Sequence, residues 1–226
     1  MTAVEDTPAI FTPEYSRVAR AFIDFVNVQV GAYMDACSGF AKNKSVVERQ
    51  VHRDVRPDGT KRGTKDAPRV MMTAVEDPTQ PYVLMHRIVL VSEYIAANAV
   101  GGSNEQHHAR AAITFLYAYW DEEVRPELGR ALGVATNEIV SDIFGDLRLI
   151  RHAVLHNKGV LTDAAFRKLK LIGDHFTPDG AVSLPNATMH RIFVLIKQDM
   201  AQRVIIDSGL QGDGTDDIIE VATQRI

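Results

Sequence analysis

The spacing of apolar residues along the chain predicts a mainly helical protein. Between residues 13 and 40, apolar side chains recur every three or four positions, as on one face of an α-helix: Val18, Phe22, Phe25, Val26, Val30, Tyr33 and Met34. Thr12, Pro13 and Glu14 form a typical helix start, with a hydroxyl cap, a proline at the first position and a carboxylate in the first turn. We therefore expect a long helix over residues 13–40, after a flexible leader in residues 1–12.

The helical pattern is lost in residues 43–81. Between Arg56 and Pro68 the chain combines turn-forming residues with charges and has almost nothing to bury. The flanking segments 46–55 and 70–75 suit either a small hairpin or irregular structure. We expect a charged, loop-rich insertion after the first helix, and a solvated loop is favoured here over a basic site for nucleic acid.

Helical periodicity resumes in residues 82–206. A second helix of about eighteen residues is marked by Met85, Ile88, Val89, Val91, Ile95 and Ala96. A third should run from Ser103 or Asn104 to about Gly133, with a kink near Arg125 because Pro126 lacks a backbone donor. Three more helices are predicted for 136–156, 163–175 and 188–206.

These elements together predict an all-α fold, an up-and-down helical bundle of about five to six helices with a charged loop insertion after the first helix. We expect one helical domain over residues 13–206. The final stretch, residues 207–226, is rich in Gly and Asp and is predicted to be a flexible tail.

Composition narrows the class of protein. Hydrophobic residues make up 46% and charged residues 24% of the chain, as in an ordinary soluble protein. With Cys37 as the single cysteine, no intrachain disulfide can form. The acidic N-terminal segment does not resemble a signal peptide, and charges interrupt every apolar stretch before it reaches the length of a membrane span, so we expect a cytoplasmic protein without a membrane segment. The net charge of −4 gives no general attraction to nucleic acid, which would need a local basic patch.

Such a patch is predicted on the helix over 136–156. At about 100° per residue, one narrow apolar seam contains Val140, Ile143, Leu147, Ile150 and Val154. Nearly opposite, within an arc of roughly 140°, lie Leu155 and a cationic face composed of Arg148, Arg151, His152 and His156. Basic residues also favour the last turns of any helix for purely structural reasons, and Asn157, Lys158 and Gly159 form an ordinary helix stop. The alternative is a chemical role for this face, because a neutral imidazole beside a guanidinium can act as a general base while the guanidinium binds a phosphate.

The segment from Arg151 to His156 resembles the Arg-X(4–6)-His signature of the HEPN superfamily. The residue after the arginine is typically polar in that family, and here it is His152. The motif comes late in a long predicted helix, and a further helix follows it. The stretch 147–159 looks like members tied to phage defence and toxin–antitoxin systems. In architecture the resemblance covers residues 82–206, whereas the insertion at 43–81 is outside the family pattern.

The resemblance implies a metal-independent endoribonuclease that needs no cofactor and works as a homodimer on RNA. Two copies of the motif would meet across the dyad in one cleft. By position, Arg151 would hold the scissile phosphate, His156 would act as general base or acid, and His152 would orient or assist. Arg148, Asn157 and Lys158 would bind the substrate, and an antitoxin protein is a partner that the resemblance allows.

Two other interpretations use the same residues. His152 and His156, one helical turn apart, have a spacing that can chelate zinc, with Asp146, Asp174 or His175 to complete the site. The nearby arginines would repel a cation, and the glutamate of the common zinc-protease motif is missing. The second interpretation is a noncatalytic helical module that binds a nucleotide, RNA or a protein through the cationic face. The sequence favours the ribonuclease.

Overall fold

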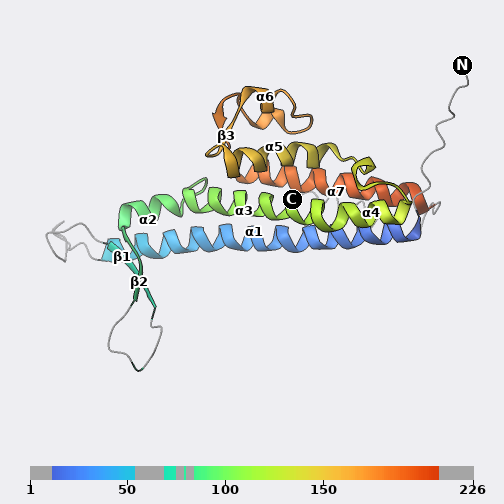
Figure 1. Ribbon diagram of the computed structural model, residues 1–226. Coiled ribbons are helices and arrows are strands. Elements are labelled where there is room, and N and C mark those ends of the chain that lie inside the picture. The colour runs from blue at the N-terminus through green and yellow to red at the C-terminus, as the bar shows by residue number, and fades with distance from the viewer. Residues whose placement is uncertain (1–11, 54–68, 75–78, 80–83, 209–226) are drawn as a thin grey trace, which may run out of the picture. The chain divides into compact units, whose positions relative to one another are not determined.

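The computed structural model describes residues 12–53, 69–74, 79 and 84–208, and it is mostly helical (Figure 1). This confirms the predicted fold class. The predicted leader up to residue 11, the charged segment 56–68 and the tail from residue 209 lie outside the described residues. Every described helix is too short or too polar to cross a bilayer.

The chain divides into two compact units. One consists of the residues up to Ala32 together with those from Ala109 onward, and the other is Tyr33–His108. Two helices, α1 (Pro13–Arg53) and α3 (Ser103–Tyr119), contribute to both. The units are described separately, and the expectation of a single domain over 13–206 stays a prediction.

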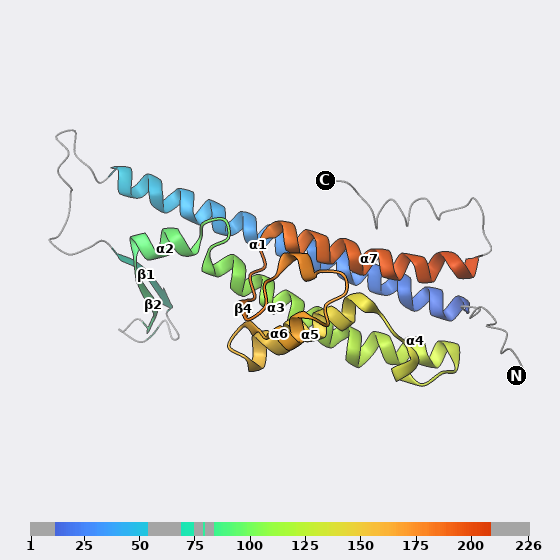
Figure 2. The ribbon, with the colours of Figure 1, turned by 90° about the horizontal axis from the view of Figure 1, so that it is seen from above.

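The first unit is an up-and-down arrangement of helices that surrounds an aromatic core. The N-terminal part of α1, α3 with its continuation α4 (Arg125–Leu132), α5 (Asp142–His156) and α7 (Asn186–Ser208) run in alternating directions (Figures 1 and 2). At the centre, the ring of Phe22 lies 5.8 Å from Trp120 and 5.7 Å from Phe144, measured between centroids, and Trp120 stacks on Phe144 at 4.2 Å. These contacts join three of the helices through apolar burial and ring packing.

The helix is irregular where a kink is predicted, at the junction of α3 and α4. A π-turn, Trp120–Val124, separates the two helices, and the backbone N–H of Arg125 donates to the carbonyl of Trp120. Pro126 follows at once. Because proline has no N–H and crowds the preceding turn, a widened turn at this point relieves the helix without ending it.

The second unit corrects the prediction for residues 43–101. The first helix continues to Arg53, so the described residues 46–53 are helical and do not form a hairpin strand. Instead, β1 (Arg69–Ala74) pairs in antiparallel fashion with β2 (Leu84–Leu90). The strand occupies half of the predicted second helix and leaves α2 as Val91–Ala97. Short apolar runs such as residues 84–90 fit either periodicity, and here strand pairing decides the outcome.

The prediction of a helix over 163–175 is wrong for most of its length. Only α6 (Asp163–Phe166) and a 3₁₀ turn, Gly173–His175, are present. Between them, the backbone N–H groups of Lys170, Leu171 and Ile172 donate to the carboxylate of Asp146 on α5, with shortest N···O distances of 2.9, 2.8 and 3.2 Å. Donors bound to a side chain cannot complete a helix. Two short paired strands, β3 (Val160–Leu161) and β4 (Gly180–Ala181), flank this segment.

Asp146 is therefore predicted to be an important stabilising residue. Its side chain is 1% exposed, so replacement by asparagine would set an amide N–H₂ against buried backbone donors. We expect Asp146→Asn to lower the free energy of unfolding by about 2–3 kcal/mol in urea denaturation. Asp142→Asn is the matched control, because Asp142 pairs with Lys170 at the surface and its loss should change stability little. Equal stability of the two variants would contradict this role.

Candidate functional site

The candidate site is the outward side of α5. This helix begins at Asp142, six residues later than predicted, with Ser141 as its cap: the Ser141 hydroxyl accepts from the N–H of Phe144. Val140 therefore lies before the helix, is 65% exposed and is not part of the apolar seam. Ile143, Leu147 and Ile150 are buried as expected, and Ala153 is buried at the end of the seam where Val154 was predicted.

The cationic face lies on the other side of the helix, toward solvent. Arg148, His152 and His156 are exposed, and Arg151 is half-buried. None of the four side chains forms a hydrogen bond or ion pair with the part of the chain that the structure describes. A set of cations without internal partners is available to an external anion.

Arg151 is held in place by an aromatic ring instead of an acid. Its guanidinium carbon lies 5.4 Å from the centroid of the Tyr117 ring on α3, and its Nε is buried without a hydrogen-bond partner among the described residues. Cation–π contact orients the guanidinium without neutralising it. Tyr117 itself is only 8% exposed, and burial, reinforced by the carboxylate of Asp121, raises the pKa of its phenol.

The two histidines of the cationic face lie against each other. Their ring centroids are 4.9 Å apart with an interplanar angle of 42°, as expected for residues one helical turn apart. Neither imidazole is hydrogen-bonded to a described residue, so the ring nitrogens of both are available to a ligand. Leu155, 48% exposed, lies on the same side of the helix and adds an apolar element to the face.

The two carboxylates of α5 bind partners outside the cationic face. The carboxylate of Asp142 binds the ammonium of Lys170 at 2.6 Å, and Asp146 holds the backbone of residues 170–172. Neither pairs with Arg148 or Arg151. The positive charge at the end of α5 is therefore not offset by its own helix.

The helix stop after His156 is tight. The N–H groups of Asn157 and Gly159 both donate to the carbonyl of Ala153, at 3.1 and 2.9 Å, and so close the end of the helix. Lys158, with φ 55°, takes the left-handed conformation within it. Arg110 of α3 lies beside this stop, since its Nη2 donates to the carbonyl of Val182 at 2.7 Å and a Cβ on Gly159 would meet its guanidinium at 3.8 Å. Sequence reasoning missed Arg110 and Tyr117, because no local pattern links them to the motif.

A pocket of about 500 Å³ adjoins the cationic face. Arg148 of the cationic face and Tyr117, which contacts Arg151, both line this pocket. Its other lining residues are Trp120, Asp121, Arg125, Ile139, Val140, Ser141, Phe144 and Gly145. Arg125 is fixed by hydrogen bonds to the carbonyl of Ile139 at 2.9 Å and to Asp121 at 3.2 Å. The pocket combines aromatic walls with guanidinium groups, which is suitable for a flat, anionic molecule.

The described residues supply no third ligand for zinc at His152 and His156. Within the described ranges, no group of three or more His, Cys, Asp and Glu side chains is placed to hold a metal ion. Asp146 is occupied by backbone donors, and the Nδ1 of His175 lies 3.2 Å from the hydroxyl of Thr188. Asp146 and His175 therefore bind other groups in the protein and not a metal ion shared with His152 and His156.

Comparison with known proteins finds no match to the chain among family models, curated proteins or solved structures. The resemblance to the HEPN superfamily therefore depends on the residues at the end of α5 and on the helical fold. Any statement about activity has to be derived from the cationic face and its surroundings.

The left-handed lysine gives a first test of this region. A side chain at φ 55° is disfavoured and glycine is not, so we expect Lys158→Gly to raise the free energy of unfolding by about 0.5–1 kcal/mol in urea denaturation. Asp179→Gly is the control: Asp179 has φ 53°, but its carboxylate accepts from the N–H of Asp163, so the gain should be smaller. Destabilisation by Lys158→Gly would show that the side chain has a structural role.

Proposed function

We propose that this protein is a metal-independent endoribonuclease of HEPN type that acts as a homodimer, with Arg151 and His156 as its catalytic residues. The observation that carries the proposal is the unneutralised cationic face. Arg148, Arg151, His152 and His156 face outward without an acidic partner in the described part of a chain whose net charge is −4. A phosphodiester supplies the negative charge that this face lacks.

The reaction follows from the chemistry of these groups. His156 accepts the proton of an RNA 2′-hydroxyl, whose oxygen forms a bond to the adjacent phosphorus. The bond between phosphorus and the 5′-oxygen breaks, and that oxygen takes up a proton from an imidazolium. Arg151 stabilises the charge that develops on the nonbridging oxygens. The products are a 2′,3′-cyclic phosphate and a 5′-hydroxyl, and no metal ion takes part.

The pocket beside the cationic face supports RNA as the ligand. Aromatic groups and Arg148 line it, and bases stack on such groups while guanidinium groups bind the backbone. His152, stacked against His156, is proposed to orient the catalytic imidazole, and Lys158 and Asn157 to contact neighbouring phosphates or sugars. A toxin–antitoxin or phage-defence setting, with an antitoxin protein as partner, belongs to the same proposal.

Arg151→Ala and His156→Ala should abolish RNA cleavage and leave the folded structure intact, because neither side chain forms a hydrogen bond or ion pair within the described residues. We expect losses of at least about 10²-fold for each variant, measured on a labelled single-stranded RNA in the presence of a chelator. Arg20→Ala and His190→Ala, at exposed positions on α1 and α7, are the matched controls and should retain activity.

Two further measurements decide the mechanism. An RNA with 2′-deoxy sugars at the cleaved positions should be bound and not cut. Cleavage that disappears with chelator and returns with stoichiometric zinc would reject the metal-independent reaction in favour of the zinc interpretation.

The homodimer makes a separate prediction. If two copies share one cleft, a mixture of Arg151→Ala and His156→Ala chains should regain part of the activity that each lacks alone, since a mixed pair contains one intact arginine and one intact histidine. Two like-charged faces repel, so sedimentation should show tighter pairing at higher salt. A monomer at tens of micromolar, or a mixture that stays inactive, would contradict the shared cleft.

Binding without cleavage is the second candidate function. It is favoured by one observation: no described residue hydrogen-bonds to either imidazole, whereas a catalytic histidine is usually oriented by a partner. This candidate predicts that the wild type binds RNA in a salt-dependent manner and that Arg151→Ala weakens binding, while no RNA is cut under any condition tested.

A further inference from the structure

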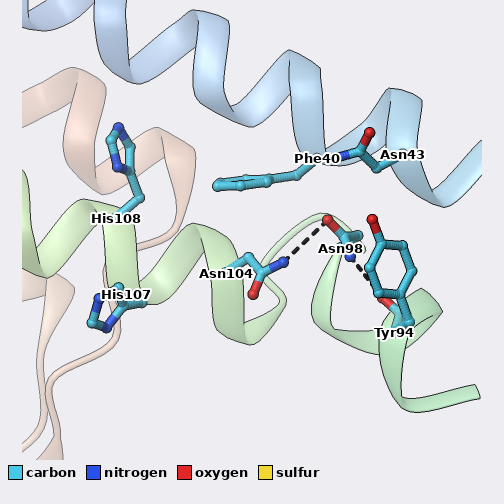
Figure 3. Close-up of a pocket in the computed structure, with 7 residues that line it drawn as sticks. All are labelled: Phe40, Asn43, Tyr94, Asn98, Asn104, His107 and His108. Atoms are coloured by element: carbon cyan, nitrogen blue, oxygen red, sulfur yellow. Dashed lines mark hydrogen bonds between the residues drawn. The ribbon is translucent and has the colours of Figure 1, made fainter. Parts of the chain in front are cut away.

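A second pocket, about 360 Å³ in volume, lies within the Tyr33–His108 unit (Figure 3). Aromatic rings, amides and two histidines line it. The lining residues are Phe40, Asn43, Tyr94, Asn98, Asn104, His107 and His108. None of the described lining residues carries a carboxylate, an ammonium or a guanidinium group. The pocket therefore suits a neutral, polar, planar ligand and not a free ion.

The wall formed by the α2–α3 turn is rigid. Asn98 is 2% exposed, its Nδ2 donates to the carbonyl of Tyr94 at 2.8 Å, and its Oδ1 accepts from the Nδ2 of Asn104 at 3.1 Å. Figure 3 shows Asn98 between Asn104 and Tyr94, with Phe40 and Asn43 on the neighbouring helix α1. The bonds leave the carbonyl oxygen of Asn104 without a partner among the described residues, so it can accept from a ligand.

The opposite wall is the phenyl ring of Phe40, which packs against the imidazole of His108. The imidazole of His108 meets Phe40 edge-on, at 6.3 Å between centroids and an interplanar angle of 81°. His108 is stacked in turn on Tyr33 at 5.9 Å and 7°. A phenyl ring fixed in this way offers a stacking surface to a flat heterocycle at little entropic cost.

Asn43 supplies the remaining polar contact. It is exposed at the border of the pocket, and its amide has no hydrogen-bond partner in the part of the chain that the structure describes. One amide offers a donor and an acceptor side by side. This pair is complementary to the edge of a purine base, where adenine presents an amino group beside a ring nitrogen and guanine presents a carbonyl oxygen beside a ring N–H.

We propose that this pocket binds a purine base, stacked on Phe40 and held by the amide of Asn43. Purines are favoured over pyrimidines because their larger ring system covers more of the phenyl surface. The site lies outside the cationic face and shares no residue with it, so the proposal does not depend on ribonuclease activity. A free nucleoside and an unpaired base of RNA carry the same chemistry.

The test compares ligands and variants of the full chain by isothermal titration calorimetry. Adenosine should bind saturably and at least about fivefold more tightly than cytidine, which presents the same donor and acceptor but a smaller stacking surface. Asn43→Ala should weaken adenosine binding by at least about fivefold, and Phe40→Leu should weaken it as well by removing the stacking surface. Asn137→Ala, at another exposed asparagine, should bind adenosine like the wild type.

A second arm identifies the source of the base. Short oligoadenylate is titrated into chains that carry Arg151→Ala, which reduces the contribution of the cationic face. An effect of Asn43→Ala on adenosine indicates a free nucleoside or nucleotide, and an effect on the oligomer alone indicates RNA. The proposal is overturned if neither ligand binds more weakly to Asn43→Ala than to Asn137→Ala, or if cytidine binds as well as adenosine. Since RNA cleavage is measured separately, its loss or retention does not affect this result.

Discussion

The buried carboxylate of Asp146 organises the side of the protein that carries the candidate site. It points inward from α5 and collects three consecutive backbone N–H groups from residues 170–172. A charged acceptor with several donors is stable in a buried position, where an unpaired carboxylate would not be. The connection between α5 and α7 is thereby held against α5. With Asp142 bound to Lys170, the basic residues on the outer side have no acidic partner on their own helix.

This arrangement gives one helix two separate tasks. Its inner side contributes Ile143, Leu147 and Ile150 to the core. The outer side is supported by Tyr117, whose ring orients Arg151 without cancelling its charge. Orientation by an aromatic ring leaves the hydrogen-bonding capacity of the guanidinium for a ligand, which an ion pair would consume. The second unit has a different character, because its pocket is built from amides and rings and has no charged group among the described lining residues.

The sequence predicts the parts of this structure that depend on local periodicity. The division of α5 into two sides follows from the spacing of its residues, and the break near Arg125 follows from Pro126. The parts that it does not predict depend on partners distant in the chain. The strand at residues 84–90 requires β1, the loop at 170–172 requires Asp146, and the support of Arg151 requires a tyrosine on another helix. Each is a tertiary contact that overrides or supplements a local preference, and a single sequence does not reveal such pairings.

The π-turn at Trp120–Val124 has a consequence for how the protein can change over evolution. One additional residue in a helical turn advances everything after it by about 100° around the axis. Tyr117, before the turn, reaches Arg151, and Arg125, after the turn, reaches the carbonyl of Ile139. Both contacts are satisfied because the helical phase shifts between them. Substitutions in this stretch alter one contact at a time, whereas a single-residue deletion would move one whole set of side chains out of register with the other. The length of this helix should therefore be under stronger selection than the identity of most residues in it.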